Sequence, residues 1–336
     1  MSLAQDIAAF IAPSAQAPPA PTSGGAVFES LALRLFAYQY AHNLPYQRFC
    51  NGRGQTPATV ERWQDIPAAP AAAFKRFALT CVPESECPVV FHSSGTTGSE
   101  TSRHFMSAEA LELYKTSLLA GYERHFPSQP LLALMPPPDL APHSSLSFML
   151  ETLGAEFIWG ESSTSQLQST LSSLATPCTV FGTAFAFVNY FDATPGEHFS
   201  LDESSLVIET GGFKGRSREV EKSELYALFA ERLGVAPAHC FSEYGMSELA
   251  SQFYSQGVDG PKLAPPWLRT RILDPVTGND TAPGQPGLLA HYDLANYNSV
   301  LAIQTEDMGV WDERGGFQLL GRAPGAVLRG CSLLAE

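Results

Sequence analysis

Four short apolar runs lie between amphipathic helical segments in the middle of the chain, and this alternation most restricts its fold. Apolar runs of this length are typical of buried strands. Helices and strands that alternate at such spacing favour a parallel sheet, because a parallel strand pair needs a long crossover connection. The sequence therefore predicts an α/β fold with a largely parallel sheet. The four runs are Leu131–Met135, Glu156–Trp159, Thr179–Phe181 and Leu206–Glu209.

Three segments are predicted to be helices. From Val27 to His42, apolar residues recur at helical spacing. A second helix is expected from Ala108 to His125, with Ser107 as its N-cap. A third is expected from about Ser223 to Leu233, where Gly234 ends it.

From Gly287 onward the pattern changes to short runs that indicate an antiparallel β segment with a turn at Asp312–Gly316. Near the start, Pro13–Gly25 is rich in Pro, Ala and Ser and is interpreted as a linker or a draped loop. We therefore expect an N-terminal segment (1–26), one composite domain (27–322) and a flexible tail (323–336). The β runs are Leu288–Asp293, Val300–Thr305, Val310–Trp311 and Phe317–Leu320.

Composition narrows the class of protein. The 336 residues, 44% of them hydrophobic, can bury a hydrophobic core that needs no structural metal ion or disulfide bond. A net charge of −14 argues against nucleic-acid binding, which normally needs a basic surface. No apolar stretch reaches the roughly 20 residues of a membrane helix, and no basic region precedes the first apolar run. The six cysteines show no CxxC spacing. These features predict a cytoplasmic globular protein, most simply an enzyme.

The segment that carries most chemical information is a Ser/Thr/Gly-rich loop, Ser93–Ser99, after an expected strand at Pro88–Phe91. Glycines let backbone N–H groups approach an anion, and hydroxyl groups add hydrogen-bond donors. A Walker P-loop requires a lysine after the last glycine, and none follows Gly98. The GxGxxG pattern of a dinucleotide site is also missing. A polyphosphate-binding loop and an ordinary surface loop both remain open from composition alone.

Three further clusters follow this loop in order: ETGGFKGR at Glu209–Arg216, FSEYGMSE at Phe241–Glu248, and TEDMG at Thr305–Gly309 before a hairpin that ends in Gly321-Arg322. Over roughly residues 70–325, this ordered set resembles the adenylate-forming superfamily. That superfamily contains acyl- and aryl-CoA ligases, peptide-synthetase adenylation domains and beetle luciferases. The resemblance implies an adenylate-forming N-terminal-domain-like fold with a β-rich C-terminal part.

The same resemblance implies a binding site for ATP and Mg²⁺. Tyr244 would stack on adenine beside Gly245, and Asp307 would accept hydrogen bonds from the ribose. Arg322 would contact the ribose or a phosphate, and Glu248 would hold Mg²⁺. The residues implied to surround the β- and γ-phosphates are Ser93, Ser94, Gly95, Thr96, Thr97 and Gly98, and those implied to lie against adenine are Gly211 and Gly212.

The implied reaction is attack of a carboxylate on the α-phosphorus of ATP, which requires neutralisation of two anions. Lys214, like Arg216, is a candidate for that neutralisation. His92 could contact the α-phosphate or the acyl carboxylate, and His143 is a candidate for the acyl pocket, although an ordinary loop histidine fits His143 equally well. The aromatic run Phe181–Phe191 suits an acyl tunnel or, more simply, a packed core.

The chain departs from the superfamily pattern in two ways. After Gly98 come Ser99, Glu100 and Thr101 instead of the usual lysine; Arg103 or Lys214 could replace it. In addition, the superfamily has a mobile C-terminal domain of roughly 100 residues, and the sequence leads us to expect that this chain lacks it.

With the tail LRGCSL, the motifs HSSGTTG, TGGFKGR and SEYGMSEL resemble the acyl-protein synthetase (LuxE-type) family. In that family a cysteine near the C-terminus accepts the acyl group from acyl-AMP and passes it to a partner acyl reductase. The matching residue here is Cys331, and the acid is expected to be fatty or otherwise apolar. A thiolate that displaces AMP from a mixed anhydride is sound chemistry. The other reading of Cys331 is a small apolar residue in a tail.

Three other functions stay open. A stand-alone acyl- or aryl-CoA ligase would use coenzyme A in place of Cys331. An inactive nucleotide-binding module is disfavoured by the presence of Glu248 and Asp307. A serine hydrolase is disfavoured because Gly245–Leu249 lacks the last glycine of GxSxG.

Overall fold

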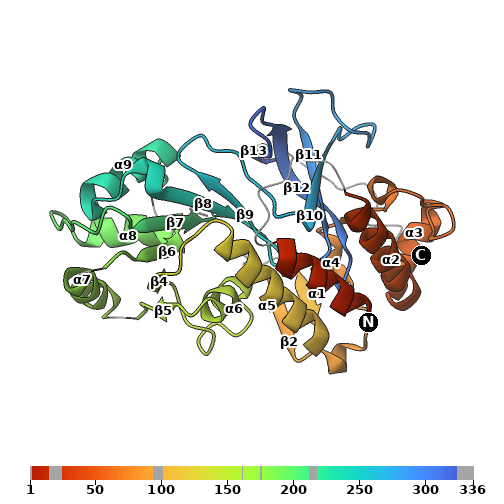
Figure 1. Ribbon diagram of the computed structural model, residues 1–336, viewed down its shortest axis with the longest axis horizontal. Coiled ribbons are helices and arrows are strands. Elements are labelled where there is room, and N and C mark those ends of the chain that lie inside the picture. Colours follow the sequence, from red (N-terminus) through yellow and green to blue (C-terminus); the bar gives the residue numbers. More distant parts are fainter. Residues whose placement is uncertain are drawn as a thin grey trace. The chain divides into compact units, whose positions relative to one another are not determined.

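The computed structural model describes residues 2–14, 25–93, 101–160, 162–174, 176–211 and 218–323, which fall into two compact units (Figure 1). Unit 1 is drawn from Met1–Arg124, Gly245–Gln252 and Pro261–Glu336, and unit 2 from His125–Tyr244 and Phe253–Gly260. Both units lie largely inside the segment 27–322 that we expect to be one composite domain. The outer boundaries of that domain stay predictions.

Unit 2 is built on a six-stranded sheet in the order β5-β4-β6-β7-β8-β9. The first five strands are parallel and only β9 is antiparallel. The α/β class, the parallel sheet and the four predicted strands are therefore confirmed, whereas β8 and β9 were not predicted. The bounds are β4 Leu131–Leu134, β5 Glu156–Phe157, β6 Thr179–Thr183, β7 Leu206–Thr210, β8 Cys240–Tyr244 and β9 Phe253–Gln256.

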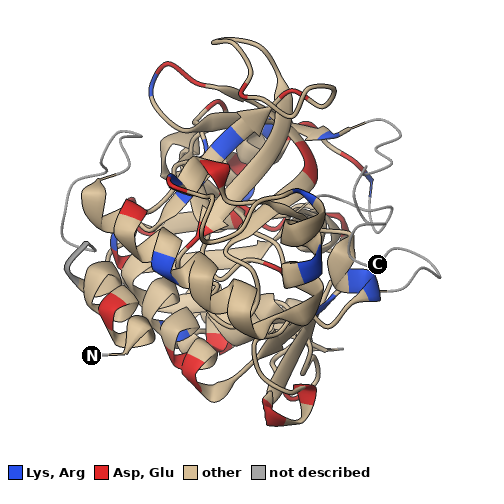
Figure 2. Ribbon diagram, turned by 90° about the vertical axis from the view of Figure 1, so that its right-hand side faces the viewer, with Lys and Arg blue, Asp and Glu red and all other residues tan. Residues whose placement is uncertain are grey.

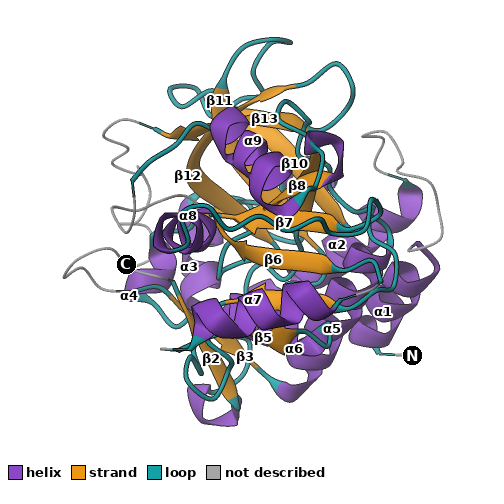
Figure 3. Ribbon diagram, turned by 90° about the vertical axis from the view of Figure 1, so that its left-hand side faces the viewer, coloured by secondary structure: helices purple, strands orange, loops and turns teal. Residues whose placement is uncertain are grey.

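Apolar faces of the helices of unit 2 bury one side of this sheet, and Figure 3 shows α7 and α9 in front of the strands. Phe187 of α8 packs edge-on against Phe229 of α9, with ring centroids 4.8 Å apart. The run Phe181–Phe191 thus contributes to a packed core. Gly234 ends α9 with a φ of 73°, as predicted. The helices are α6 Ser145–Thr152, α7 Ser163–Ser173, α8 Ala184–Ala193, α9 Lys222–Leu233 and the 3₁₀ turn η3 Pro237–His239.

Unit 1 contains the predicted antiparallel β segment as a sheet in the order β1-β12-β11-β10, with β13 paired to β12. The two runs expected at 300–305 and 310–311 are one strand, because the backbone ladder continues through the polar residues Glu306 and Asp307. A separate two-stranded sheet pairs β2 with β3. The bounds are β1 Ala69–Pro70, β2 Val89–His92, β3 Arg103–Met106, β10 Leu268–Leu273, β11 Gly287–Asp293, β12 Ala302–Trp311 and β13 Phe317–Arg322.

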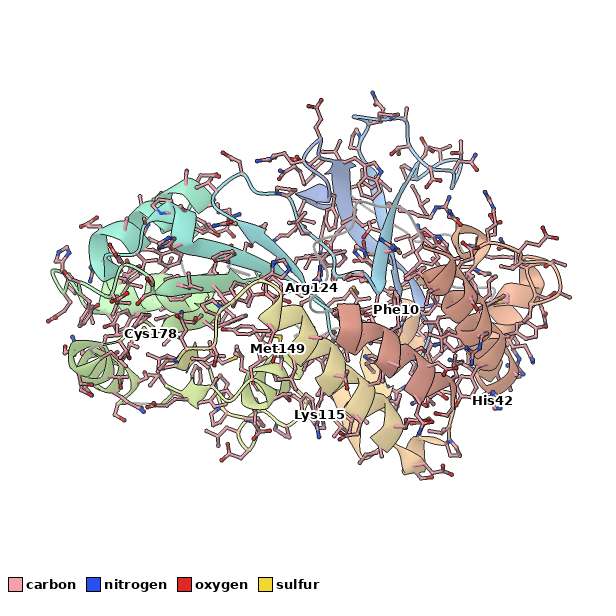
Figure 4. The ribbon with its side chains drawn as sticks, viewed as in Figure 1. Phe10, His42, Lys115, Arg124, Met149 and Cys178 are labelled. Atoms are coloured by element: carbon pink, nitrogen blue, oxygen red, sulfur yellow. The ribbon has the colours of Figure 1, made fainter. Side chains whose placement is uncertain are left out.

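The predicted helices α2 and α5 are confirmed, and Ser107 Oγ accepts the Ala110 N–H as the expected N-cap. Helix α1 was not predicted, and it ends with Pro13 and Ser14, the first two residues of the expected linker or loop. Residues 15–24 of that segment lie outside the described part. Helix α1 runs beside α5 (Figures 1 and 4), with Ile7 and Ile11 fully buried. The helices are α1 Leu3–Ser14, α2 Ala26–His42, α3 Leu44–Gly52, α4 Ala73–Arg76, α5 Ala108–Glu123, η1 Trp63–Asp65 and η2 Glu84–Glu86.

Figure 2 marks the charged residues of the described part of the chain, with Lys and Arg lying singly or in short runs. Ion pairs in the described part include local ones, such as Arg62 with Asp65 and Lys115 with Glu112, and longer-range ones, such as Arg34 with Asp6. No described helix is both long and apolar enough to cross a membrane.

A buried polar network fixes the segment 245–252 inside unit 1. Trp267 Nε1 donates to Ser117 Oγ (2.9 Å) and Ser251 Oγ (3.1 Å), and Ser251 Oγ donates to Asp293 Oδ1 (2.7 Å). Asp293 Oδ2 also accepts the Ala250 N–H at 3.0 Å. Burial raises the pKa of Asp293 to about 6. The network therefore anchors the chain two residues after Glu248.

The buried His291 makes the stability of unit 1 depend on pH. Burial lowers the pKa of His291 to about 3, while histidine in an unfolded chain titrates near 6.5. Between these values only the unfolded chain binds the proton, so the stability declines as pH falls below about 6.5, by up to about 1.4 kcal/mol per unit. We expect His291→Gln to remove about 2 kcal/mol of the loss between pH 7 and pH 5 in urea unfolding. Parallel pH profiles for the two proteins would contradict this assignment.

Candidate active site

The predicted phosphate-binding loop connects two paired strands. His92 of β2 lies opposite Arg103 of β3, the Ser93 N–H donates to Ser102 O (3.2 Å), and the Ser102 N–H donates to Ser93 Oγ (3.1 Å). Both ends of the loop are thus fixed, and the strand expected before it is confirmed. The predicted residues outside the described part of this loop are Ser94, Gly95, Thr96, Thr97 and Gly98.

Ser247 joins the segment 245–252 to both strands of this hairpin. Its hydroxyl donates to His92 O (3.2 Å), and its carbonyl oxygen lies 2.7 Å from His104 Nδ1. His104 is 2% exposed, and burial lowers its pKa to about 4, so the ring is neutral at pH 7 and donates through Nδ1–H. The two contacts hold Ser247, and therefore its neighbour Glu248, against the strands that lead into and out of the loop.

Glu248 is the buried carboxylate of the site, at 6% exposure. Burial raises its pKa, and the Ser102 hydroxyl, Lys75 and Arg322 act in the opposite direction. Ser102 is 1% exposed, and no described atom lies within hydrogen-bonding distance of its Oγ. An ionisable carboxylate beside a buried hydroxyl that lacks a partner fits a site for a cation and phosphate oxygens.

The donor set of unit 1 is compatible with Mg²⁺. No cluster of three or more His, Cys, Asp or Glu suited to a metal occurs among the described residues. Mg²⁺ does not need one, because it is commonly held by one or two carboxylates together with substrate phosphates and water. Glu248 would supply the protein oxygen.

Asp307 and Arg322 are brought together, as the resemblance implies. They lie opposite each other on β12 and β13, with Arg322 Nε 3.9 Å from Asp307 Oδ1. Arg322 also lies 3.9 Å from Glu306 Oε2, and its side chain is 76% exposed. Arg322 also contributes, as the smallest of the causes, to lowering the pKa of Glu248 against the effect of burial.

Unit 2 carries the two other predicted clusters at the carboxyl ends of neighbouring parallel strands, which is where ligands of open α/β sheets bind. Thr210 at the end of β7 lies opposite Glu243 of β8, and Thr210 Oγ1 donates to Glu243 Oε2. Gly211 follows with a φ of 66°, a left-handed conformation that favours glycine. This contact fixes the two strand ends relative to each other.

The remaining predicted site residues are scattered. Tyr244 ends β8 and is 9% exposed, with its ring centroid 5.6 Å from that of Phe253, and Gly245 begins the segment that enters unit 1. His143 lies exposed between β4 and α6, so its place in an acyl pocket stays a prediction. The predicted residues Gly212, Lys214 and Cys331 lie outside the described part.

Two residues of this region were not found from the sequence. Lys75 acts electrostatically on Glu248, and His104 holds Ser247. Neither residue stands in one of the motifs. Each interacts with a residue more than 140 positions away, and a single sequence carries no local signal for such a long-range interaction.

A substitution of His104 tests whether its hydrogen bond to Ser247 O stabilises the fold. We expect His104→Ala to lower the free energy of unfolding by about 3 kcal/mol, because a buried ring and its hydrogen bond are both lost. His42, labelled in Figure 4, is the matched control: its Nδ1 also lies 2.7 Å from a backbone oxygen, that of Tyr38, but the residue is exposed. His42→Ala should change the free energy of unfolding by less than about 0.5 kcal/mol in the same urea titration. Equal changes in the free energy of unfolding for the two variants would argue against a stabilising role of the His104–Ser247 hydrogen bond.

Comparisons with known proteins identify chains that are similar to this one. A family model described as acyl-protein synthetase, LuxE, matches residues 156–336. A Vibrio harveyi protein named long-chain-fatty-acid–luciferin-component ligase is 24% identical over 321 residues, which cover 89% of this chain and 84% of that protein. An Aliivibrio fischeri protein of the same name is 22% identical over 303 residues, covering 85% and 79%.

Solved structures show the fold. A 2-hydroxyisobutyryl-CoA ligase in complex with 2-HIB-AMP and CoA matches with a TM-score of 0.66 and 16% identity, covering 92% of this chain and 78% of that one. ATP-bound MatB from Rhodopseudomonas palustris matches with a TM-score of 0.52 and 16% identity, covering 81% and 56%. The predicted adenylate-forming fold is confirmed.

Proposed function

The chain belongs to the acyl-protein synthetase (LuxE) family, and on that premise we propose that it is an ATP-dependent ligase that activates a long-chain fatty acid as acyl-AMP and transfers the acyl group to its own Cys331. The acid class is taken from the name of the two bacterial relatives. A partner acyl reductase would then receive the acyl group. The observation that carries the proposal is the buried Glu248 beside the Ser102 hydroxyl at the exit of the Ser93–Gly98 loop.

In the first step a carboxylate oxygen of the acid attacks the α-phosphorus of ATP, and the bond to the bridging oxygen of the β-phosphate breaks. Pyrophosphate leaves, and the acid becomes a mixed anhydride with AMP. The protein contributes positioning and neutralisation of charge. The loop that begins at Ser93 would surround the terminal phosphates, with Gly211 and Tyr244 at the adenine and Asp307 at the ribose hydroxyls. His92 and Lys214 would face the reacting carboxylate and phosphate.

Bound Mg²⁺ would supply positive charge between the phosphates, and Glu248 is the residue that would hold it. Burial raises the pKa of Glu248, and Lys75 and Arg322 act in the opposite direction by favouring its charged form.

In the second step the Cys331 thiolate attacks the carbonyl carbon of acyl-AMP. The carbon–oxygen bond to the phosphate breaks, AMP leaves with the electron pair, and a thioester forms. The thiol proton passes to solvent when the thiolate forms. Cys331 stands nine residues after Arg322, and nine extended residues span at most about 30 Å. That length allows the sulfur to approach a nucleotide bound at Asp307 and Arg322.

A stand-alone acyl-CoA ligase is the second candidate, because the solved structure with a TM-score of 0.66 is a CoA ligase bound to an acyl-adenylate and CoA. In that case coenzyme A would replace Cys331 as the thiol. The tail motif LRGCSL favours the protein thiol.

The direct test is intact-protein and peptide mass spectrometry after incubation with ATP, Mg²⁺ and fatty acids of graded chain length. We expect a mass gain equal to the acyl group, removable by hydroxylamine and located on the peptide that contains Cys331. An unmodified protein, together with acyl-CoA formed when coenzyme A is added, would favour the second candidate.

A further inference from the structure

The phosphate loop does not carry the positive charge that its proposed ligand requires. ATP bears about four negative charges at neutral pH, and such anions are normally neutralised by Lys, Arg and Mg²⁺. Residues 93–102 contain one acid, Glu100, and no Lys or Arg. The next cation, Arg103, lies 4.0 Å from Glu84 and packs over the Phe105 ring at 5.5 Å. A cation from another element is therefore needed.

Helix α4 is placed to supply one. Strand β1 pairs in parallel with β12 at Ile303 and Gln304, and the Ala71 N–H donates to Gln304 O at 2.9 Å. Helix α4 follows at once, so it begins beside the stretch of β12 that leads to Asp307. The order of elements thus brings α4 to the proposed ribose site.

A buried contact also connects α4 with the phosphate-loop hairpin. Phe74 is fully buried and lies edge-on to His104 of β3, with ring centroids 5.7 Å apart. His104 in turn holds Ser247, the neighbour of Glu248. The residue after Phe74 is Lys75, which is exposed. Lys75 therefore stands one residue from the contact that joins α4 to the hairpin on which the loop is carried.

Lys75 differs from Arg322, the cation that lies beside Asp307 at the proposed ribose site. Arg322 lies 3.9 Å from both Glu306 and Asp307, so its charge is already partly compensated. No carboxylate of a described residue lies within 4 Å of Lys75 Nζ. Lys75 therefore keeps its charge available for a ligand.

We propose that Lys75 binds the β- and γ-phosphates of ATP and takes the place of the lysine that the loop lacks. This inference rests on the proposed adenylation activity and adds a residue to its substrate site. The ammonium group is a compact point charge with three donors, suited to phosphate oxygens. It stays on the pyrophosphate side of the bond that breaks, where charge develops as pyrophosphate leaves.

The test compares Lys75→Ala, Lys75→Arg and the control Arg76→Ala in the full chain. Arg76 is the next residue of the same helix and is also exposed. We expect Lys75→Ala to weaken Mg·ATP binding in calorimetry and to lower kcat/KM for ATP in pyrophosphate exchange, each roughly 10- to 100-fold. Lys75→Arg should recover part of the loss. AMP binding should change less than about twofold, because AMP lacks the two phosphates.

The possible outcomes separate the two proposals. Equal weakening of ATP and AMP binding by Lys75→Ala, or an effect no larger than that of Arg76→Ala, would overturn the role of Lys75 and leave adenylation intact. Wild-type protein that binds ATP but exchanges no pyrophosphate with any fatty acid would overturn the proposed function. In that case, selective loss of ATP over AMP binding in Lys75→Ala would still support the phosphate contact.

Discussion

Replacing Cys331 with serine should abolish the covalent acyl-enzyme while pyrophosphate exchange stays within about twofold of wild type, because adenylation precedes the step that uses the sulfur. A serine hydroxyl is scarcely ionised at neutral pH, so we expect at least about a 10³-fold slower capture of the acyl group. The measurement is labelling with radioactive fatty acid, followed by electrophoresis and peptide mapping.

Cys87→Ser is the matched control for this loss of a thiol. Among the described cysteines Cys87 is half-buried, whereas Cys50, Cys81, Cys178 and Cys240 are buried. Burial raises the pKa of the Cys87 thiol, which makes it a poor nucleophile. Its replacement should leave labelling unchanged. Undiminished labelling of Cys331→Ser would refute the role of Cys331, and undiminished acyl-CoA formation by that variant would support the ligase that uses coenzyme A.

Glu248→Gln should lower the rate of acyl-AMP formation by about 10²- to 10³-fold, equivalent to roughly 3–4 kcal/mol of transition-state stabilisation. The amide keeps the shape of the side chain but removes the negative charge that would hold Mg²⁺. The fold should not suffer, because the substitution removes a charge that burial disfavours. The measurement is pyrophosphate exchange across a range of Mg²⁺ concentrations, with urea unfolding in parallel.

Asp293→Asn provides the contrast, since Asp293 is an equally buried carboxylate of unit 1 with a structural role. It accepts hydrogen bonds from Ser251 and Ala250 in the network around Trp267. We expect this variant to change the free energy of unfolding and to keep the wild-type dependence on Mg²⁺. A Glu248→Gln protein with the same Mg²⁺ dependence as wild type would show that Glu248 does not hold the ion.

Local patterns in the sequence were sufficient to predict many of the helices and strands. The apolar runs that became β4, β6 and β7, the Ser107 cap of α5 and the Gly234 end of α9 are all properties of a few neighbouring residues. Elements with a weaker local pattern were not found. Strand β8 contains Ser242, Glu243 and Tyr244, so no continuous apolar run marks it in the sequence.

The candidate site shows the same division. The resemblance supplied Glu248, Asp307 and Arg322, and the structure places them in one unit. It could not supply Lys75 or His104, which stand outside the motifs. His104 reaches Ser247 only because β3 returns antiparallel to β2 and the segment 245–252 is anchored beside that hairpin.

By itself, the sequence determined the α/β class, the positions of most strands along the chain and the chemical kinds of residue in the motifs, because these depend on spacing along a short stretch of backbone. Only the tertiary structure decided which distant side chains meet. The Ser102 hydroxyl and the Glu248 carboxylate are buried near each other, and no local pattern encodes that proximity. Such pairs depend on how the elements pack, and packing is a property of the whole chain.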